Sequence, residues 1–498
     1  MVNTRFLCDG YKGTVRWAGE VAGTEGIWLG VEWDDPNRGK HDGTHQNIKY
    51  FTTKHPKSGS FLRAKKADFG SSFSDALREK YKNLKGRNFQ ANTEYLEDLR
   101  KNMNAPFVEL VGLEDVKGIK EELDLLLHLQ VESCLINGEP ENSDLSLKAP
   151  KVKSIDLTDN LLPSWDHVAN ITKHFPKLYK LTLSENRLIL PSDIKKISPY
   201  FEGITSMTLV KCDIDAEYLA AIVPLWPKVE NLIIAYNNIT NINIPPLVHL
   251  QSLDLEGNHI GEWKEIAKLG KLPQLKDLNI SQCKIPQISI TENDKVFSQL
   301  VKLTVRENLL KDWGSINSLF WLPSLQHLVI TNNPIMKEKH TEDFTVAKLK
   351  SLKTINRSIV DEEERKNAEI FYWKKFSSDY LETKNLLEFE AHHPSYAELV
   401  TKYGKPEKTS YTGLKSNISI IFVHKNLHPP VEKVKAVPSN LKVGKLKVLL
   451  RRLFSLKCSK LNLTREIKKG MLLPMDDDLK DITAYDVEEN DKIYIECE

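Results

Sequence analysis

The sequence predicts a multidomain α+β protein in which three modules follow one another: a small β-barrel-like module, a curved solenoid, and a module of mixed strands and helix. Three observations support this prediction. Glycine and tryptophan cluster in residues 1–70, a leucine pattern recurs within residues 107–390, and strands alternate with a helix in residues 415–498. The length of 498 residues fits three or four domains at ~100–200 residues each.

The N-terminal module has the pattern of a small, strongly bent sheet. Trp17, Trp28 and Trp33 are three of the nine tryptophans, and short alternating runs such as GTVRWAGE and GIWLGVEWD lie between glycines. We expect Trp17 in the core, whereas Trp28 fits either a core or a surface slot. A polar stretch follows in residues 71–106. Its segment SDALREKYKNL, with Ser74 as N-cap, predicts a helical linker.

The central part of the chain repeats with a period of about 25 residues, which is the leucine-rich-repeat range. Nine segments fit the pattern L-x-x-L-x-L-x-x-N/C-x-L. The Asn or Cys position of the pattern falls at Cys134, Asn160, Asn186, Cys212, Asn237, Asn258, Cys283, Asn308 and Asn333. The segments resemble leucine-rich repeats, which predicts a curved solenoid in which each repeat buries its apolar face on its neighbours.

The pattern predicts an internal hydrogen-bond ladder and a concave surface. The Asn side chains are expected to bond the backbone of neighbouring turns, and a small Cys fits the same place, so the cysteines at these positions are expected to be structural. The concave surface is expected at Gln130, Asp156, Thr182, Thr208, Ile233, Asp254, Asn279, Thr304 and Val329. No single charge dominates these positions, and they identify no ligand.

A C-terminal cap is predicted to close the repeats near residue 390, followed by a linker over 391–414. The helix after Asp361 carries apolar residues that we assign to the cap core rather than to a binding surface. They are Ile370, Phe371, Trp373 and Phe376.

Residues 415–498 read as strand, helix, strand and strand. NISIIFVH is a strand, and the helix after it presents Leu446, Leu449, Leu450 and Leu453. This order resembles the ubiquitin-like β-grasp fold. No Gly-Gly pair ends the sequence, so we expect a docking module rather than a conjugated one. The basic stretch 433–469 and the acidic stretch 476–498 are expected to form solvated salt bridges.

The sharpest motif is Gly39-Lys40-His41-Asp42-Gly43, followed by Tyr50-Phe51. Together with the run GIWLGVEWD, it resembles the CAP-Gly domain. That resemblance implies binding of the acidic C-terminal Glu-Glu-Tyr/Phe tails of α-tubulin and of end-binding proteins. His41 stands where the hallmark has Asn, and Gly23 stands where the family usually has an aromatic residue.

Such a tail carries carboxylates and one ring, so its site needs positive charge, hydrogen-bond donors and a flat apolar slot. Glycines allow the backbone to approach closely and offer its N–H groups, although Gly39 and Gly43 also suit simple turns. Lys65 and its neighbour Lys66 likewise suit an ordinary solvated pair. The predicted tail-binding residues are Trp28, Trp33, Gly39, Lys40, His41, Asp42, Gly43, Phe51, Arg63 and Lys65.

Composition and motif searches exclude several function classes. The 70 basic and 68 acidic residues nearly cancel, so an acidic partner needs a local basic patch, and no basic stripe indicates nucleic-acid binding. No nucleotide, zinc-protease or hydrolase motif occurs, so we expect no enzyme, no cofactor and no metal. The Asp476–Asp478 run is expected to be a solvated turn. The six cysteines form no CxxC pair and no apolar stretch could span a membrane, which favours a reduced cytoplasmic compartment.

The order of the three modules resembles the tubulin-folding cofactors. The resemblance implies a chaperone that takes α-tubulin with the help of cofactor B and acts with cofactors D and C in assembling and dissociating the α/β-tubulin heterodimer. It also implies a cytoskeletal association and a link from the ubiquitin-like module to the proteasome. Two alternatives stay open from the sequence: a CAP-Gly adaptor on microtubules, and an enzyme or a factor of the ubiquitin pathway.

Overall fold

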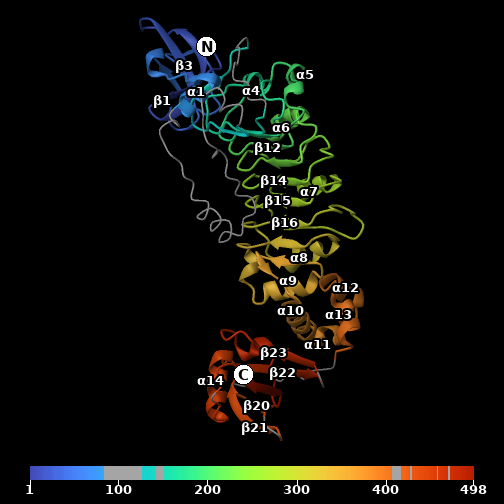
Figure 1. Cartoon of the computed structure of the whole chain (residues 1–498). Helices are drawn as coiled ribbons and strands as arrows, with labels where there is room; N and C mark the ends of the chain where they lie inside the picture. Colours follow the sequence, from blue (N-terminus) through green and yellow to red (C-terminus); the bar gives the residue numbers. More distant parts are fainter. Residues whose placement is uncertain are drawn as a thin grey trace. The chain divides into compact units, whose positions relative to one another are not determined.

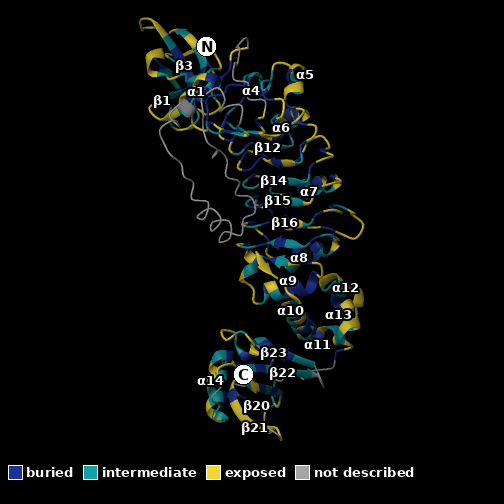
Figure 2. Ribbon diagram, viewed as in Figure 1, coloured by how far each residue is buried: buried dark blue, intermediate teal, exposed yellow. Residues whose placement is uncertain are grey.

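The computed structural model describes residues 1–82, 126–141, 151–406, 417–426, 429–456, 458–468 and 471–497. The chain divides into two compact units. The first comprises Met1–Ile285 with Val296–Val305, and the second comprises Pro286–Lys295 with Arg306–Glu498. Strands and helices of both units are drawn in Figure 1, and Figure 2 shows that their exposed positions concentrate in loops and on outer helix faces.

The first unit begins with a four-stranded antiparallel sheet in the order β1-β2-β3-β6. Its strands are β1 (Arg5–Cys8), β2 (Tyr11–Glu20), β3 (Ile27–Trp33) and β6 (Gly59–Leu62), and a hairpin of β4 (Thr44–His45) and β5 (Ile48–Lys49) lies between the last two. Leu7 and Asp68 exchange two backbone hydrogen bonds of 2.8 Å, which return the chain to β1 after β6. The sheet is therefore bent as predicted, although strand pairing does not close it into a barrel.

A helix and a short strand cover the first repeat. Strand β7 (Ser71–Ser72) pairs with β9 (Ile136–Gly138), and helix α1 (Phe73–Lys82) buries Phe73, whose ring centroid lies 5.9 Å from that of Phe175. Ser72, not the predicted Ser74, caps this helix, because Ser72 Oγ accepts from Asp75 N at 3.1 Å. The segment 71–82 is thus a lid on the solenoid. The rest of the predicted linker, 83–106, lies outside the described residues.

The repeats form parallel strands of three residues each. In the first unit these are β8 (His128–Gln130), β10 (Ser154–Asp156), β11 (Lys180–Thr182), β12 (Ser206–Thr208), β13 (Asn231–Ile233), β14 (Ser252–Asp254), β15 (Asp277–Asn279) and β16 (Lys302–Thr304). Neighbouring strands pair in register, so one apolar side chain per repeat stacks in a column, as Leu232, Leu253 and Leu278 do. Helices such as α6 (Ala216–Ile222) and α7 (Trp263–Ala267) lie along one side of the strands (Figure 1).

The Asn position forms the predicted ladder. Asn237 Oδ1 accepts from the N–H groups of Cys212 at 2.9 Å and Ile214 at 3.2 Å, while Nδ2 donates to the carbonyls of Leu209 and Ile234. Cysteine fits the same place, because Cys212 Sγ donates to a carbonyl of the previous repeat at 3.4 Å. Cys283 is likewise buried and donates to a carbonyl of the previous repeat at 3.2 Å, so the expected structural role is confirmed for Cys212 and Cys283.

The second unit contains the last repeat and its cap. Strand β17 (His327–Val329) pairs with β18 (Thr354–Ile355), which pairs with β19 (Ser358–Ile359). The helices are α8 (Trp313–Ser318), α9 (Thr341–Lys348), α10 (Glu362–Lys375), α11 (Ser377–Glu382), α12 (Leu386–His392) and α13 (Tyr396–Tyr403). As predicted, α10 buries Ile370 and Trp373, and Phe371 and Phe376 pack against the same core.

The cap extends beyond the predicted boundary at residue 390. Helix α13 lies within the segment 391–414 that the sequence suggested was a linker, and it buries Tyr396 and Leu399 in the cap core. Tyr396 Oη donates to the carbonyl of Trp373 on α10 at 2.5 Å. The rest of that segment, 407–414, lies outside the described residues.

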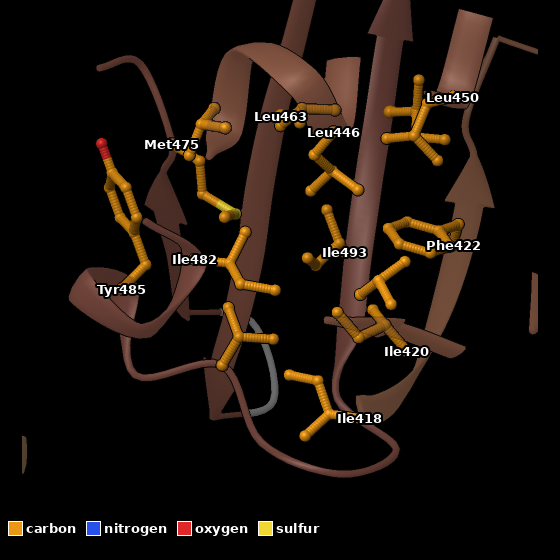
Figure 3. Close-up of a cluster of buried hydrophobic side chains, with 14 of the residues drawn as sticks. Ile418, Ile420, Phe422, Leu446, Leu450, Leu463, Met475, Ile482, Tyr485 and Ile493 are labelled. Carbon is orange, nitrogen blue, oxygen red and sulfur yellow. The ribbon is translucent and has the colours of Figure 1, made fainter. Parts of the chain in front are cut away.

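The C-terminal module has the predicted β-grasp fold, with the five-stranded sheet order β21-β20-β24-β22-β23. Its elements are β20 (Asn417–His424), β21 (Val431–Pro438), α14 (Val443–Leu453), β22 (Leu461–Lys468), β23 (Met471–Pro474), a 3-10 turn (Ile482–Tyr485) and β24 (Lys492–Cys497). Figure 3 shows Leu446 and Leu450 of α14 facing Phe422 and Ile493 of the sheet, and all four are fully buried. The predicted Leu449 and Leu453 pack at the edge of this core.

Candidate functional site

The glycines of the 39–43 loop are required by close backbone packing. A Cβ at Gly39 would lie 2.4 Å from the carbonyl carbon of Ser58. Gly43 has φ +97°, and a Cβ there would lie 2.1 Å from the carbonyl oxygen of Phe51. The loop is held against Gly59, which accepts from Lys40 N at 2.7 Å and donates to the His41 carbonyl at 2.8 Å.

This packing corrects one sequence expectation. The loop N–H groups were expected to face a bound carboxylate, but those of Lys40 and His41 both donate to the carbonyl of Gly59. The N–H groups of Gly43 and Thr44 donate to the side chains of His41 and Asp42 at 3.0 and 3.1 Å. These donors are therefore engaged within the domain. The loop's exposed charge for a partner is the Lys40 side chain.

His41 is half-buried and takes a defined tautomer. Because its Nδ1 accepts from Gly43 N, the neutral ring carries its proton on Nε2, which leaves a donor on the other edge. Burial lowers the pKa of His41 below its ordinary value, the charges of His45 and Lys40 lower it further, and Asp42 opposes them. Hydrogen bonding from Thr44 lowers the pKa of Asp42, which keeps that carboxylate charged.

An aromatic cluster lies beside this loop. It consists of Trp17, His41, His45, Tyr50, Phe51 and Phe61. Phe61 is at its centre, with ring centroids 5.1 Å from His41, 5.3 Å from Tyr50 and 5.6 Å from Phe51. Phe51 is buried and the other members are half-buried, so the cluster presents ring faces and edges at the surface.

Four members of the cluster were not predicted as site residues: Trp17, His45, Tyr50 and Phe61. Trp17 was expected in the core. In the structure Val15, two positions earlier, is buried, and a regular strand would place both side chains on one face. A β-bulge lies between these residues, and Trp17 instead contacts Tyr50 at 5.0 Å. The Tyr50-Phe51 pair in the sequence could have indicated the other aromatic residues of the cluster.

Trp33 lies in the core, and Trp28 lies beneath a cationic side chain. Trp33 is only 5% exposed and packs against Phe6 in the core of the sheet, so its assignment to the slot was wrong. Trp28 is half-buried beneath Arg63, whose guanidinium carbon lies 3.8 Å from the Trp28 ring centroid. Arg63 also donates to the carbonyls of Glu25 and Ile27. It is thus fixed to the β2–β3 loop, whereas Lys65 is exposed.

The N-terminal module docks on the first repeats through charged side chains. Lys12 Nζ donates to the carbonyl oxygen of Asp159 at 2.6 Å and pairs with its carboxylate. Lys54 Nζ lies 2.8 Å from both carboxylate oxygens of Asp213. These contacts fix the aromatic cluster and the concave strands within one compact unit, an arrangement that the sequence does not reveal.

Asp34 lies half-buried in the same interface. Its carboxylate pairs with Arg5 of its own module, and Arg187 of the repeats donates to the Asp34 carbonyl at 3.1 Å. Burial favours the neutral carboxyl, but the hydrogen bonds and charge of Arg5, with help from Arg187, hold the pKa of Asp34 below its ordinary value. The interface therefore retains a charged carboxylate.

Comparison with known proteins gives two family matches and relatives over the full length. The CAP-Gly domain family matches residues 2–67, and a leucine-rich-repeat family matches residues 252–383. Tubulin-specific chaperone E of Danio rerio is 33% identical, and that of Homo sapiens is 32% identical; each alignment covers 99% of this chain and 98% of the relative.

Among solved structures, the ubiquitin-like domain of mouse tubulin-specific chaperone e is 25% identical. That match covers 18% of this chain and 95% of that domain, with a TM-score of 0.16. Among the described residues, no helix has the length and apolar character needed to cross a membrane. The near-complete coverage by relatives above 30% identity is decisive: this chain belongs to the tubulin-specific chaperone E family.

Proposed function

We propose that this chain is a tubulin chaperone that holds α-tubulin at two places. The CAP-Gly domain binds the acidic C-terminal tail, and the concave face of the repeats binds the folded body. The observation that carries this proposal is the docking of the CAP-Gly domain on the repeats through Lys12 and Lys54, which keeps both surfaces in one unit. A weak tail contact then raises the local concentration of the second contact.

The aromatic cluster suits the terminal ring of the tail, and Lys40 suits its carboxylates. Phe61 and Tyr50 offer half-buried rings against which an aromatic residue can pack. Lys40 is exposed beside them, and Lys65 adds a second exposed charge in the same domain. Neutral His41 offers its Nε2–H as a donor to a carboxylate or carbonyl.

On this proposal the chain acts by binding and not by chemistry of its own. Dissociation of the α/β-tubulin heterodimer draws its free energy from preferential binding of α-tubulin. Cofactor B delivers α-tubulin, cofactors D and C act on the heterodimer, and the ubiquitin-like module docks a further partner such as the proteasome. We place this activity in the cytoplasm, close to the microtubule cytoskeleton.

Capture of purified α-tubulin, with and without its last few residues, tests the tail contact. Wild-type chain is compared with Lys40→Ala and with Lys195→Ala, a matched exposed lysine on the solenoid. Loss of one charge-assisted contact weakens capture of intact α-tubulin about tenfold for Lys40→Ala. Capture of tail-less α-tubulin is weaker for every variant and no longer depends on Lys40. Equal capture of intact and tail-less α-tubulin by the wild-type chain contradicts the proposal.

Sedimentation with microtubules separates this function from that of a microtubule adaptor. A chaperone stays in the supernatant with free tubulin or reduces the amount of polymer. Co-pelleting of the chain with intact microtubules in proportion to polymer supports the adaptor instead.

A further inference from the structure

Two thiols meet at the C-terminal end of the ubiquitin-like module. Cys458 lies in the turn between α14 and β22, and Cys497 is the last residue of β24. Their sulfur atoms lie 2.7 Å apart in a hydrogen bond donated by Cys458. The two residues are 39 positions apart in sequence, so the fold itself brings them together.

The backbone around the pair is held in place from both sides. Strands β22 and β24 pair antiparallel with Leu461 opposite Cys497, which fixes the distance from the turn to the strand end. Asn426 Oδ1 accepts from Cys497 N at 3.0 Å, and Asn426 Nδ2 donates to the Cys497 carbonyl at 3.3 Å. The backbone therefore holds the two thiols next to each other, and little main-chain movement is needed to join them.

The chemical setting allows the pair to react. Both cysteines are half-buried, so a small oxidant reaches them, whereas Cys212 and Cys283 are buried in the repeats. Arg451 of α14 donates to the Ser459 carbonyl at 3.2 Å and places its positive charge near Cys497. Burial and the neighbouring Cys458 nevertheless raise the pKa of Cys497 to about 11.

We propose that Cys458 and Cys497 form a reversible redox site that closes to an intrachain disulfide. The oxidant is a peroxide or glutathione disulfide. With a peroxide, one of the two thiolates takes an oxygen atom to become a sulfenic acid while the peroxide leaves as hydroxide, and the sulfur of the other cysteine then attacks the sulfenic sulfur with release of water. With glutathione disulfide, two exchange steps form the S–S bond and release two reduced glutathione molecules. In both routes the two cysteines lose two electrons and two protons to the oxidant.

The disulfide would restrain the end of the central strand of the module. Strand β24 lies between β20 and β22 in the sheet, and its end would be joined to the turn that precedes β22. Opening of this strand then requires the whole 39-residue loop to move as a closed ring. Oxidation thus makes the docking module more rigid without altering the repeats.

The test uses the purified full-length chain, reduced and then exposed to hydrogen peroxide or to glutathione disulfide. We expect the loss of two alkylatable cysteines, an intact mass lower by two hydrogen atoms, and a peptide linking Cys458 to Cys497. Reducing agent restores both thiols. Amide hydrogen exchange in β22 and β24 slows on oxidation.

Variants make the outcome specific. Cys458→Ser and Cys497→Ser each abolish the link, whereas Cys134→Ser, which removes a half-buried cysteine of the repeats, leaves it intact. Separate glutathione or sulfinic adducts on the two wild-type cysteines, with no peptide that links them, overturn the proposal. So does a link that joins two molecules. The peptide map of the wild-type chain decides the question, so the test holds even if a variant fails to fold.

Discussion

The leucine-rich repeats and the CAP-Gly domain place their polar and aromatic side chains differently. In the repeats, Asn237 is 3% exposed, and its amide hydrogen-bonds to buried backbone groups. In the CAP-Gly domain, His41 and Tyr50 each contact Phe61, and all three stay half-buried. The contrast teaches that the first set stabilises the fold and that the second set is open to a partner. Substitutions in the two sets should therefore separate stability from binding.

The largest expected effect belongs to the ladder. Asn237→Ala leaves the N–H groups of Cys212 and Ile214 without their acceptor in the interior, which costs about 4 kcal/mol of unfolding free energy. The neighbouring Asn238→Ala is the matched control, because Asn238 is exposed and bonds a surface carboxylate. Urea unfolding of the two variants checks the difference. A loss below about 1 kcal/mol for Asn237→Ala would mean that the ladder does not stabilise the solenoid.

The next effect tests whether the glycine loop is a structural requirement of the site. Gly43→Ala combines a strained φ with a clash against the Phe51 carbonyl, so it lowers stability by about 3 kcal/mol and weakens tail binding. Gly10→Ala is the control, since its φ is +79° but nothing lies within 4 Å of the added Cβ. Thermal unfolding of the two full-length variants separates the effect of the clash from that of the strained φ. Equal shifts for both variants would show that strain alone, and not packing, matters at Gly43.

A smaller effect on stability and a clear one on binding are expected at the centre of the aromatic cluster. Phe61→Ala removes the ring that contacts His41, Tyr50 and Phe51, and it weakens affinity for an α-tubulin tail peptide about 30-fold. Tyr11→Ala removes an exposed ring outside the cluster, stacked on Arg38, and should leave affinity unchanged. Fluorescence anisotropy with a labelled tail peptide measures both. Unchanged affinity for Phe61→Ala places the tail elsewhere.

The sequence predicts the repeats better than the site for a physical reason. Each repeat must match its neighbours, so the Leu and Asn positions recur and the register follows from the pattern, as at Leu232 and Asn237. The orientation of Trp17 instead depends on one β-bulge, which leaves no periodic signal. The ion pair of Lys54 and Asp213 cannot be predicted from the sequence either, because the two charged residues are far apart in the chain and no pattern links them.

The smallest expected effect is a pH dependence of the CAP-Gly domain. The pKa of His41 in the folded domain lies below its ordinary value of 6.5, so the unfolded chain binds more protons between the two values. Stability from His41 is therefore complete above pH 6.5 and falls as the pH drops through that window. Protonation also removes the Nδ1 acceptor for Gly43 N.

His41→Asn isolates this contribution, because an amide oxygen keeps an acceptor in the loop but does not titrate. Unfolding midpoints and tail affinity measured at pH 7.5 and pH 5.5 should differ more for the wild-type chain than for the variant. The charge of His45 disfavours the charged form of His41, so His45→Asn reduces the pH dependence in part. If wild-type and His41→Asn follow the same pH profile, the loop charge does not govern this domain, and the cluster acts on the tail through its rings alone.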